Sequence, residues 1–295
     1  MSLLRIRHRT DYLYNNPVQL GPHRLLLRPR EGHELRLVSL DIVTTPPSTI
    51  GWTADVFGNA IATAAFDAQT RSLSIESTAV VDLNSAAWPV FAISADAARY
   101  PFDYAAHERD DLGALRRPLP DSMGRIAAWA KSFVARTPTD TLSLLKDLNA
   151  GITGAVSYQA REDEGTQTAS YTLNAARGSC RDMALLFAES ARVLGFGARI
   201  VSGYLYNPEN PVGTTHAWAE IFVPGAGWIT FDPTNRRMGG FNLIPVAVGR
   251  DLSQVMPVGG SYIGTSTDLA RLTVAVEVTP VTQAMAAPDP QMARA

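Results

Sequence analysis

The sequence is poor in cysteine, in long apolar runs and in excess charge, and each scarcity excludes a class of protein. One cysteine in 295 residues excludes an internal disulfide and a zinc site built from several thiolates. No run of 18 apolar residues occurs, so no transmembrane helix is expected. With 26 Lys+Arg against 28 Asp+Glu, the net charge of −2 provides no basic surface for nucleic acid or an anionic membrane. We therefore expect neither as a partner.

The composition that remains is typical of a folded chain. A hydrophobic fraction of 46% excludes disorder over most of the sequence, and the length suits one large or two ordinary domains. The N-terminus lacks the apolar core of a secretory signal because Arg5, Arg7 and Arg9 interrupt it. We expect a cytoplasmic protein, since a reducing compartment suits an unprotected thiol.

The first part of the chain has the pattern of an antiparallel, sandwich-like β domain. Leu4, Ile6 and His8 alternate with arginines, as in a half-buried strand. Turn residues separate further short strands, which are expected at 35–43, 60–66 and 73–83. The pattern predicts a β domain over 1–95 and an irregular connector over 96–120.

From Asp121 the periodicity becomes helical, which predicts an α+β domain over 121–280. Asp121 is a candidate N-cap for a helix, and a second helix is expected over 142–152. The apolar face of the first helix comprises Met123, Ile126, Ala127, Ala130, Phe133 and Val134.

Three further segments of the chain have sequence patterns that predict their structure. The loop 161–167 carries Glu162, Asp163 and Glu164, but their spacing is not that of a calcium loop, so a surface loop and no metal site are expected. Alternating Leu272 to Val278 predicts a last strand. Residues 281–295 are rich in Ala, Pro and Gln, and we expect a disordered tail.

The stretch Gly178-Ser-Cys-Arg-Asp182 is the most informative one. The apolar spacing that follows predicts an amphipathic helix that begins beside Cys180 and stops at Gly195. A thiol is a good nucleophile only as the thiolate, and a helix N-terminus favours an anion through its free N–H groups and its dipole. Cys180 is therefore either a buried bystander or a chemical group.

A histidine could take the proton of this thiol. His8, His23 and His33 fall in the β region and His107 in the connector, which leaves His216 on an expected strand close to the helix.

Strand parity supplies a third residue. Strands are expected at 199–206, 216–223 and 228–232. A three- or five-residue loop pairs Phe222 with Trp228, which makes Asp232 a same-face diagonal neighbour of His216 at about 7–8 Å. We predict this odd register, with a bulge near Gly225–Gly227.

Each of the three residues also has a purely structural interpretation. Free cysteines are usually buried, a strand histidine is often hydrogen-bonded for packing, and an aspartate before proline often forms a turn. Together, however, the three residues favour a catalytic triad, because they occur in the order Cys180, His216, Asp232 and are expected on a helix, a strand and a second strand.

Four motifs resemble the bacterial transglutaminase-like family, a branch of the papain-like thiol enzymes. The spacing of 36 residues from residue 180 to residue 216 is far shorter than the ~130–150 of papain and cathepsins. Arg7–Tyr14 and Asp55–Asn59 resemble the N-terminal β domain of the family. The four core motifs are Gly178–Asp182, Arg199–Tyr204, His216–Glu220 and Gly227–Asn235.

The resemblance implies a papain-like core of helices on an antiparallel sheet, and a triad. Cys180 would be the nucleophile, His216 the base and then the acid, and Asp232 the residue that orients His216. The implied reaction is attack on an amide carbonyl, release of an amine and a thioester that goes to water or to an amine. The N–H of Cys180 is one oxyanion donor, and Tyr171 or Gln167 is a candidate for the second.

Other candidate cleft residues have competing roles. Asp182 caps the helix or fixes the active-site loop, and capping is favoured. Trp218 is expected to pack under the triad rather than bind substrate. Arg250 and Asp251 either line the cleft or form a surface ion pair.

The sequence thus favours a peptidase or amidase, without cofactor or metal, that acts on a peptide or amide substrate. Crosslinking is less favoured because no calcium-type acidic cluster occurs. The alternative is a catalytically silent binding or assembly module that retains the fold, against which the intact Cys–His–Asp set counts. No glycine-rich phosphate loop follows a strand, so a nucleotide-binding enzyme is disfavoured. The β domain shapes the cleft or recognises a partner, and the sequence does not choose between these roles.

Overall fold

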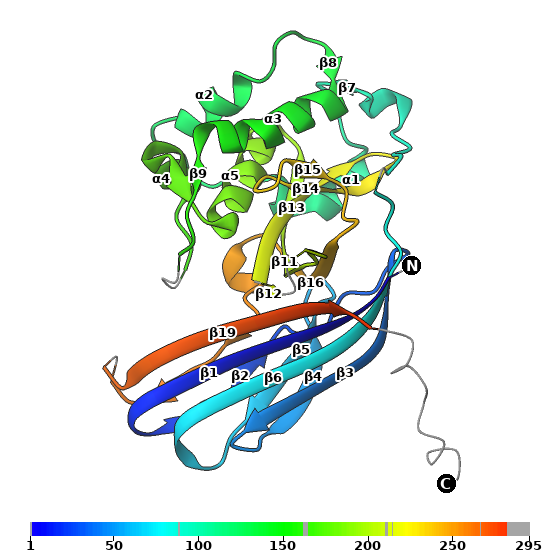
Figure 1. Cartoon of the computed structure of the whole chain (residues 1–295). Helices are drawn as coiled ribbons and strands as arrows, with labels where there is room; N and C mark the ends of the chain where they lie inside the picture. Colours follow the sequence, from blue (N-terminus) through cyan, green and yellow to red (C-terminus); the bar gives the residue numbers. More distant parts are fainter. Residues whose placement is uncertain are drawn as a thin grey trace, which may run out of the picture.

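The computed structural model describes residues 2–87, 89–161, 165–209, 212–213, 215–265 and 267–281. Residues 162–164 of the expected acidic loop and residues 282–295 of the expected tail lie outside this part. The described chain is an α+β protein with a strand-rich unit below a unit of helices and a shorter sheet (Figure 1). The expected fold class is confirmed.

A long antiparallel sheet forms the base of the molecule (Figure 1). Its order is β12-β19-β1-β6-β3, and β18 pairs with the far end of β1. Leu4, Ile6 and His8 are buried while Arg7 and Arg9 are exposed, as their alternation predicts. The strands are β1 Ser2–Leu20, β3 Leu35–Thr45, β6 Gln69–Leu83, β12 Val212–Gly213, β18 Tyr262–Ile263 and β19 Leu269–Pro280.

A second, smaller sheet packs against one end of the long sheet and completes a sandwich. A buried cluster that includes Tyr14, Leu25, Phe66 and Ile75 fills the space between the two sheets. The order of the smaller sheet is β17-β2-β5-β4. These strands are β2 His23–Leu25, β4 Thr49–Ala54, β5 Ala60–Ala65 and β17 Val258–Gly259.

The last long strand, β19, joins the sheet of the N-terminal β domain and not the sheet of the core. It pairs with β1 from Leu4 opposite Pro280 to Tyr14 opposite Leu269. The strand itself matches the alternating pattern of the sequence, but that pattern does not specify a partner strand. The β domain is therefore built from both ends of the chain.

The upper unit is organised around a five-stranded antiparallel sheet of order β15-β14-β13-β11-β16. Ala198 and Ile200 of β11 and Ala219 and Ile221 of β13 belong to the same buried core as the helix over Cys180–Val193. The strands are β11 Gly197–Leu205, β13 Thr215–Val223, β14 Gly227–Asp232, β15 Arg237–Met238 and β16 Leu243–Gly249.

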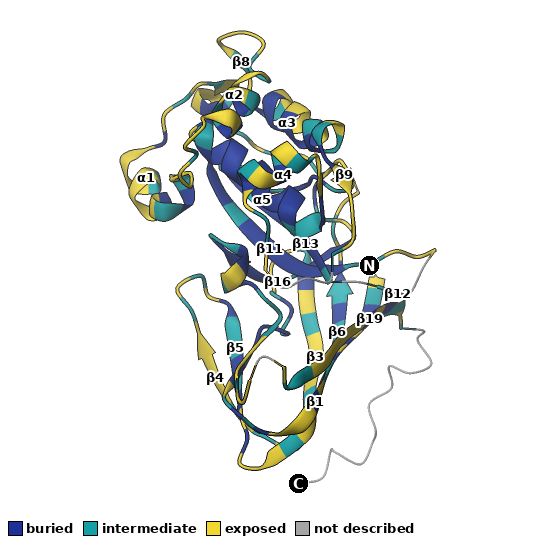
Figure 2. Cartoon of the chain, turned by 90° about the vertical axis from the view of Figure 1, so that its left-hand side faces the viewer, coloured by how far each residue is buried: buried dark blue, intermediate teal, exposed yellow. Residues whose placement is uncertain are grey.

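The central helix of this unit, α5, is buried along most of its length (Figure 2). Every residue from Asp182 to Arg192 is buried, and Gly195 ends the helix with a φ of +93°. The unit also contains two short strand pairs, β7 Arg99–Tyr100 with β8 Thr139–Asp140 and β9 Ser157–Tyr158 with β10 Arg177–Gly178, and the second pair leads into the start of α5. The helices are α1 Ala106–Leu112, α2 Arg125–Lys131, α3 Thr141–Ala155, α4 Ala169–Ala175 and α5 Cys180–Val193, with 3-10 turns η1 Ala95–Ala97, η2 Gly113–Arg116 and η3 Leu252–Gln254.

Two segments before α5 differ from the sequence-based expectation. The expected irregular connector contains α1, which is short and lacks an apolar repeat. The helix expected from Asp121 is confined to α2, and Met123 lies outside it with 70% exposure. Asp121 still serves the helix start, because its carboxylate accepts the N–H groups of Ile126 and Ala127 at 2.7 and 3.3 Å.

The two units share a packed interface. The buried core that contains α5 also contains Leu4 and Ile6 of β1 and Val276 and Val278 of β19. At the edge of the core sheet, the fully buried Asn59 binds the backbone of Val248 on β16 through both its amide oxygen and its amide nitrogen (2.9 and 2.7 Å). The β domain is therefore attached both to the core around α5 and to this edge of the core sheet.

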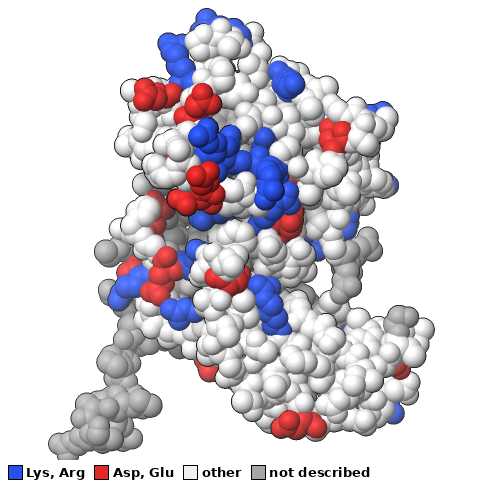
Figure 3. Space-filling view, turned by 180° about the vertical axis from the view of Figure 1, so that it is seen from behind, with Lys and Arg blue, Asp and Glu red and all other residues white. Residues whose placement is uncertain are grey.

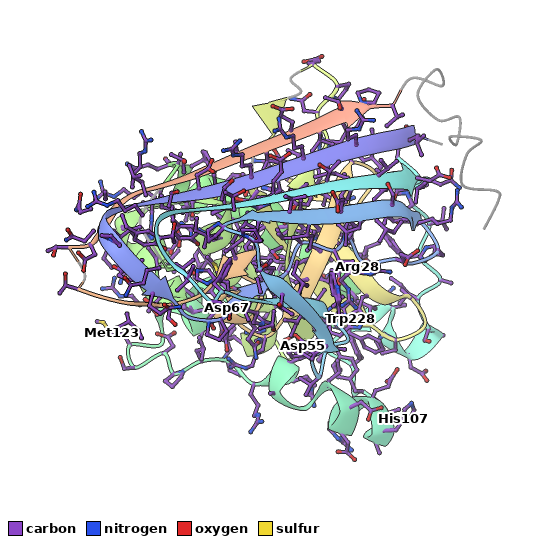
Figure 4. The ribbon with its side chains drawn as sticks, turned by 90° about the horizontal axis from the view of Figure 1, so that it is seen from below. Arg28, Asp55, Asp67, His107, Met123 and Trp228 are labelled. Atoms are coloured by element: carbon purple, nitrogen blue, oxygen red, sulfur yellow. The ribbon has the colours of Figure 1, made fainter. Side chains whose placement is uncertain are left out.

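The surroundings of that contact are charged. Asp55 of the β domain, labelled in the view from below (Figure 4), accepts the side-chain amide of Asn59 at 2.8 Å and lies 3.5 Å from Arg24. Asp55 and Glu220 both face Arg30 closely enough to act on its charge. Figure 3 shows the opposite side of the molecule from that in Figure 1, where Lys and Arg are interspersed with Asp and Glu.

Candidate active site

Cys180 is the first residue of α5, as its sequence context predicts. The preceding Ser179 donates both its N–H and its hydroxyl to one oxygen of Asp182, each at 2.8 Å. The other oxygen of Asp182 accepts the N–H of Gln167 at 2.8 Å. Asp182, which is fully buried, therefore caps the helix and also fixes the loop that approaches Cys180.

His216 and Asp232 come from the hairpin of β13 and β14. Phe222 pairs with Trp228, so the predicted odd register is confirmed. The ladder runs without a shift to Val223 opposite Gly227, and the predicted bulge is wrong. A three-residue turn closes the hairpin, and positive φ angles of +84° at Gly225 and +72° at Gly227 reverse the chain instead.

The two side chains meet directly. His216 Nε2 lies 2.8 Å from Asp232 Oδ2, and only 7% of His216 and 1% of Asp232 is exposed. Asp232 also accepts the side-chain amide of Asn235 at 2.7 Å and the N–H groups of Thr234 and Asn235. The Asp-Pro-Thr-Asn turn thus holds the carboxylate in a fixed orientation against His216.

The electrostatics of the site favour a charged histidine. Burial lowers the pKa of His216, but hydrogen bonds and Coulombic attraction from Asp232 and Cys180 outweigh it and raise the pKa to about 10. Burial likewise opposes charge on Asp232, yet the bonds from His216 and Asn235 leave its pKa lowered. Because Nε2 faces Asp232, the ring reaches Cys180 through Nδ1, and an imidazolium there stabilises a thiolate.

Tyr158 is a residue of the site that sequence reasoning missed. It lies on β9 opposite Gly178, two residues before Cys180. Burial and the negative charge of Cys180 raise the pKa of Tyr158, although 57% of the residue is exposed. Its strand is two residues long, and no periodicity in the sequence marks it.

Two more supporting residues were missed. Arg161 lies 3.7 Å from Asp182 and donates to the Gln167 side chain at 2.9 Å. Asn235 belongs to a motif that the sequence already singled out, Gly227–Asn235, and its position three residues after Asp232 is the signal of a side chain that folds back on the turn.

Among the described contacts, neither candidate for a second oxyanion donor bonds Cys180 through its side chain. The side-chain amide of Gln167 donates to Thr172 Oγ1 and to the carbonyl of Arg177, each at 3.1 Å, so its N–H groups are engaged. Tyr171 lies on α4 with 53% exposure, and within the described chain its side chain makes no hydrogen bond to the Cys180 loop. The expectation for Gln167 is corrected, because neither spacing nor residue type fixes the orientation of a side chain on a loop; Tyr171 stays a candidate.

Trp218 lies beneath His216, with ring centroids 6.0 Å apart. It is 1% exposed and packs with Val201, Leu243 and Val248. This location is suited to supporting the histidine ring from below rather than to touching a substrate.

The expectation that Arg250 lines the cleft is wrong. Its carbonyl accepts from Arg192 at 2.9 Å, in the last turn of α5, which places it about 18 Å along the helix from Cys180. Its guanidinium binds the carbonyls of Ala114 and Arg117 and forms a 2.9 Å ion pair with Asp251. Arg250 therefore ties the connector to the core, while Asp251 lines a cavity between the two units.

The described residues contain no group of three or more His, Cys, Asp and Glu side chains placed to hold a metal ion. Within the same residues, none of the helices combines the length and the apolar character that a membrane span requires.

Comparison with known families and structures agrees with this geometry. Residues 4–82 match the bacterial transglutaminase-like N-terminal region, and residues 127–233 match the transglutaminase-like superfamily. An uncharacterized protein of Mycobacterium tuberculosis is 28% identical over 295 residues, which covers 94% of this chain and 92% of that protein. A protein-glutamine gamma-glutamyltransferase of Pseudomonas aeruginosa is 30% identical over 94 residues, or 29% of this chain and 13% of that enzyme.

A solved structure shares the fold. The crystal structure of a candidate cysteine protease from Cytophaga hutchinsonii matches with a TM-score of 0.73 at 20% identity, and the match covers 96% of this chain and 92% of that one. Cys180, His216 and Asp232 all fall within the matched transglutaminase-like region. The chain belongs to the bacterial transglutaminase-like family.

Proposed function

We propose that the protein is a thiol-dependent enzyme that acts on amide bonds through a thioester on Cys180. The observation that carries this proposal is the buried His216–Asp232 pair, whose imidazole is hydrogen-bonded to Cys180 at the start of a helix. A protonated His216 next to Cys180 stabilises the thiolate and holds a proton for the leaving amine. Amide cleavage needs both.

In the first half of the reaction, the Cys180 sulfur forms a bond to the amide carbon and the carbonyl electrons move to oxygen. His216 gives its Nδ1 proton to the leaving nitrogen, the C–N bond breaks, and a thioester and a free amine result. Asp232 keeps the ring oriented through Nε2 at 2.8 Å. It also stabilises the charge on the imidazolium before the proton leaves.

The negative oxygen of the intermediate needs donors. The N–H of Cys180 lies in the first turn of α5, where amides lack an intrahelical partner and the helix dipole favours an anion. We propose the hydroxyl of Tyr158 as the second donor, since β9 places this residue opposite Gly178, two residues before Cys180.

In the second half, neutral His216 takes a proton from the acceptor, the acceptor attacks the thioester, and the C–S bond breaks to restore the thiolate. With water as acceptor the product is an acid, and with an amine it is a new amide. We favour water and thus a peptidase or amidase, because Cys180 is partly exposed and Tyr158 beside it is open to solvent.

A peptide and amide library, offered to wild type and to Cys180→Ala, tests this proposal. We expect cleavage by wild type and none by the variant, and a thioester adduct on intact wild-type protein. Monodansylcadaverine added as a competing amine separates the two outcomes, since hydrolysis yields free acid and transamidation yields a labelled product. Absence of any adduct or turnover with an intact fold would favour the silent binding module instead.

A further inference from the structure

A cavity of about 550 Å³ lies between the β domain and the core, alongside α5. The β domain contributes Tyr12, Tyr14, His23 and Tyr262, and the core contributes Leu185 and Asp251. We propose that this cavity binds an aromatic or bulky apolar side chain of a peptide substrate, a few residues from the amide that is cleaved. The inference rests on the proposed function and assigns the β domain a role in substrate recognition.

The first support is the inward face of β1, which changes character along its length. Leu4 and Ile6 are followed on the same face by His8, Thr10, Tyr12 and Tyr14. Polar side chains occupy this face between the core around α5 and the core of the sandwich. Tyr12 and Tyr14, which follow them, pack in the sandwich and also line the cavity.

The polar part of this face of β1 begins beside the five-stranded sheet that carries His216. His8 bonds the hydroxyl of Tyr204 at 2.9 Å and that of Thr10 at 3.0 Å. Tyr204 pairs with Thr215, the residue before His216. The face of β1 therefore extends from the neighbourhood of His216 to the cavity.

The second support is the chemistry of the walls. Tyr14 and Tyr262 lie 5.1 Å apart, Tyr12 stacks beside Tyr14 at 6.4 Å, and His23 meets Tyr12 edge-on at 6.1 Å. Burial lowers the pKa of His23, so its ring is neutral at neutral pH. Asp251 is the one carboxylate among the described lining residues, and none of them is Lys or Arg. Aromatic walls of this kind favour an uncharged ring that can stack or meet them edge-on.

The third support is the distance to Cys180. Leu185 follows Cys180 by five residues on α5, which is about 7.5 Å along the axis. Thr166, another lining residue, directly precedes Gln167, whose N–H is fixed by Asp182. Residue 185 also lies about 140° around the helix from residue 180, so the path is longer than the axial rise. Because an extended peptide advances about 3.3 Å per residue, the side chain in the cavity belongs to a residue three or more positions from the scissile amide.

Two glycines of the lining differ in what a side chain would meet. A side chain at Gly260 would collide with the His23 ring at 2.3 Å, so glycine is required there. A Cβ at Gly259 meets nothing within 4 Å, but Gly259 pairs with Arg24 and therefore faces away from the His23 ring, so Gly259→Phe leaves the cavity open and serves as a control. Gly51, on the opposite edge strand of the same small sheet, is equally free of neighbours but does not line the cavity, which makes Gly51→Phe a second control.

The experiment measures binding to full-length Cys180→Ala protein by fluorine NMR. The probe is acetyl-Ala-Ala-X-Ala-Ala-amide with X as 4-fluorophenylalanine, and unlabelled peptides with X as Phe, Ala or Glu compete with it. We expect the Phe peptide to bind about tenfold or more tightly than the Ala or Glu peptides. Ser253→Trp, which fills the cavity from the core side, should weaken the Phe peptide by a similar factor, and Gly259→Phe and Gly51→Phe should not.

A second variant guards against misfolding. Met256→Trp fills the same cavity at another lining position, and thermal unfolding of both filling variants checks the fold. Equal binding of the Phe and Ala peptides, or undiminished binding by both folded filling variants, would overturn the inference. Because the binding assay uses protein without the thiol, a failure of the thioester chemistry leaves its result unchanged. In active enzyme, the filling variants should raise KM for aromatic peptides and leave kcat nearly unchanged.

Discussion

His216 and Asp232 are joined across a hairpin by a 2.8 Å bond between Nε2 and Oδ2, and the bond is shielded from water. The odd register of β13 and β14 brings them to one face, and the turn after Asp232 fixes the carboxylate. The imidazole is therefore held with its other nitrogen towards Cys180 before any substrate arrives.

Replacing Asp232 with Asn should lower kcat/KM by about 100-fold or more, because the neutral amide no longer stabilises the imidazolium. The measurement is a pH–rate profile, in which the alkaline limb should move to lower pH as the pKa of His216 falls. Asn235→Ala, which removes one support of the carboxylate and leaves the carboxylate itself in place, should have a much smaller effect. Equal rates for wild type and Asp232→Asn would disprove the role of the pair.

The same pair should make stability depend on pH on the alkaline side. The pKa of His216 is raised from 6.5 to about 10 in the folded state, so its stabilising effect is complete below 6.5 and is lost as the pH rises to about 10. Urea unfolding of wild type and His216→Gln should therefore show a difference that shrinks between these two values. A difference that does not change with pH would mean that the histidine is neutral in the folded protein.

His8 should have the opposite effect, on the acid side. Burial lowers its pKa from 6.5 to about 4, so the unfolded chain binds a proton that the folded chain does not. Stability should fall by about 3 kcal/mol as the pH drops from 6.5 to 4. Chemical unfolding across this range measures the slope of the unfolding free energy against pH. His8→Gln keeps a side chain able to bond Tyr204 or Thr10. In this variant the slope should correspond to about one proton fewer than in wild type.

Asp182 should be needed for both stability and activity. Its substitution by Ala leaves the N–H groups of Ser179 and Gln167 buried without an acceptor, at a cost of about 2–4 kcal/mol. Asp182→Asn, which keeps an acceptor oxygen, should retain part of that stability. Thermal unfolding and the alkylation rate of Cys180 report the two effects separately, and unchanged values in Asp182→Ala would contradict the assigned role.

Asn59 should couple the β domain to the core. Asn59→Ala removes both bonds to the Val248 backbone, and we expect a loss of about 2–3 kcal/mol. Asn84→Ala, on the same domain but with its backbone N–H rather than its side chain bonded to Glu34, serves as control. Calorimetry should show a lower Tm for the first variant alone, and equal Tm values would contradict the coupling.

The residues of the triad were predictable because local rules place them. Periodicity locates the start of α5 at Cys180, and strand parity with a short turn sets Asp232 on the face of His216. Both rules act over a few residues and do not require the tertiary structure.

Contacts between distant segments were not predictable in this way. Alternation identified β19 as a strand but not β1 as its partner, and the position of Arg250 depends on where Arg192 ends its helix. Tyr12 and Tyr14 belong to Arg7–Tyr14, which resembles the N-terminal β domain of the family, but the cavity that they line is closed by residues more than 100 positions away. Tyr158 lies on a strand too short for any pattern.

The most direct test of the Cys180–His216–Asp232 account is the rate at which iodoacetamide alkylates Cys180 as a function of pH. Cys180 is the sole cysteine of the sequence, so intact mass reports a single site. The account predicts fast alkylation of wild type at pH 6, and a rate about 100-fold lower in His216→Ala, because an ordinary thiol is about 1% ionised or less at that pH. The same pH profile in both proteins would contradict it.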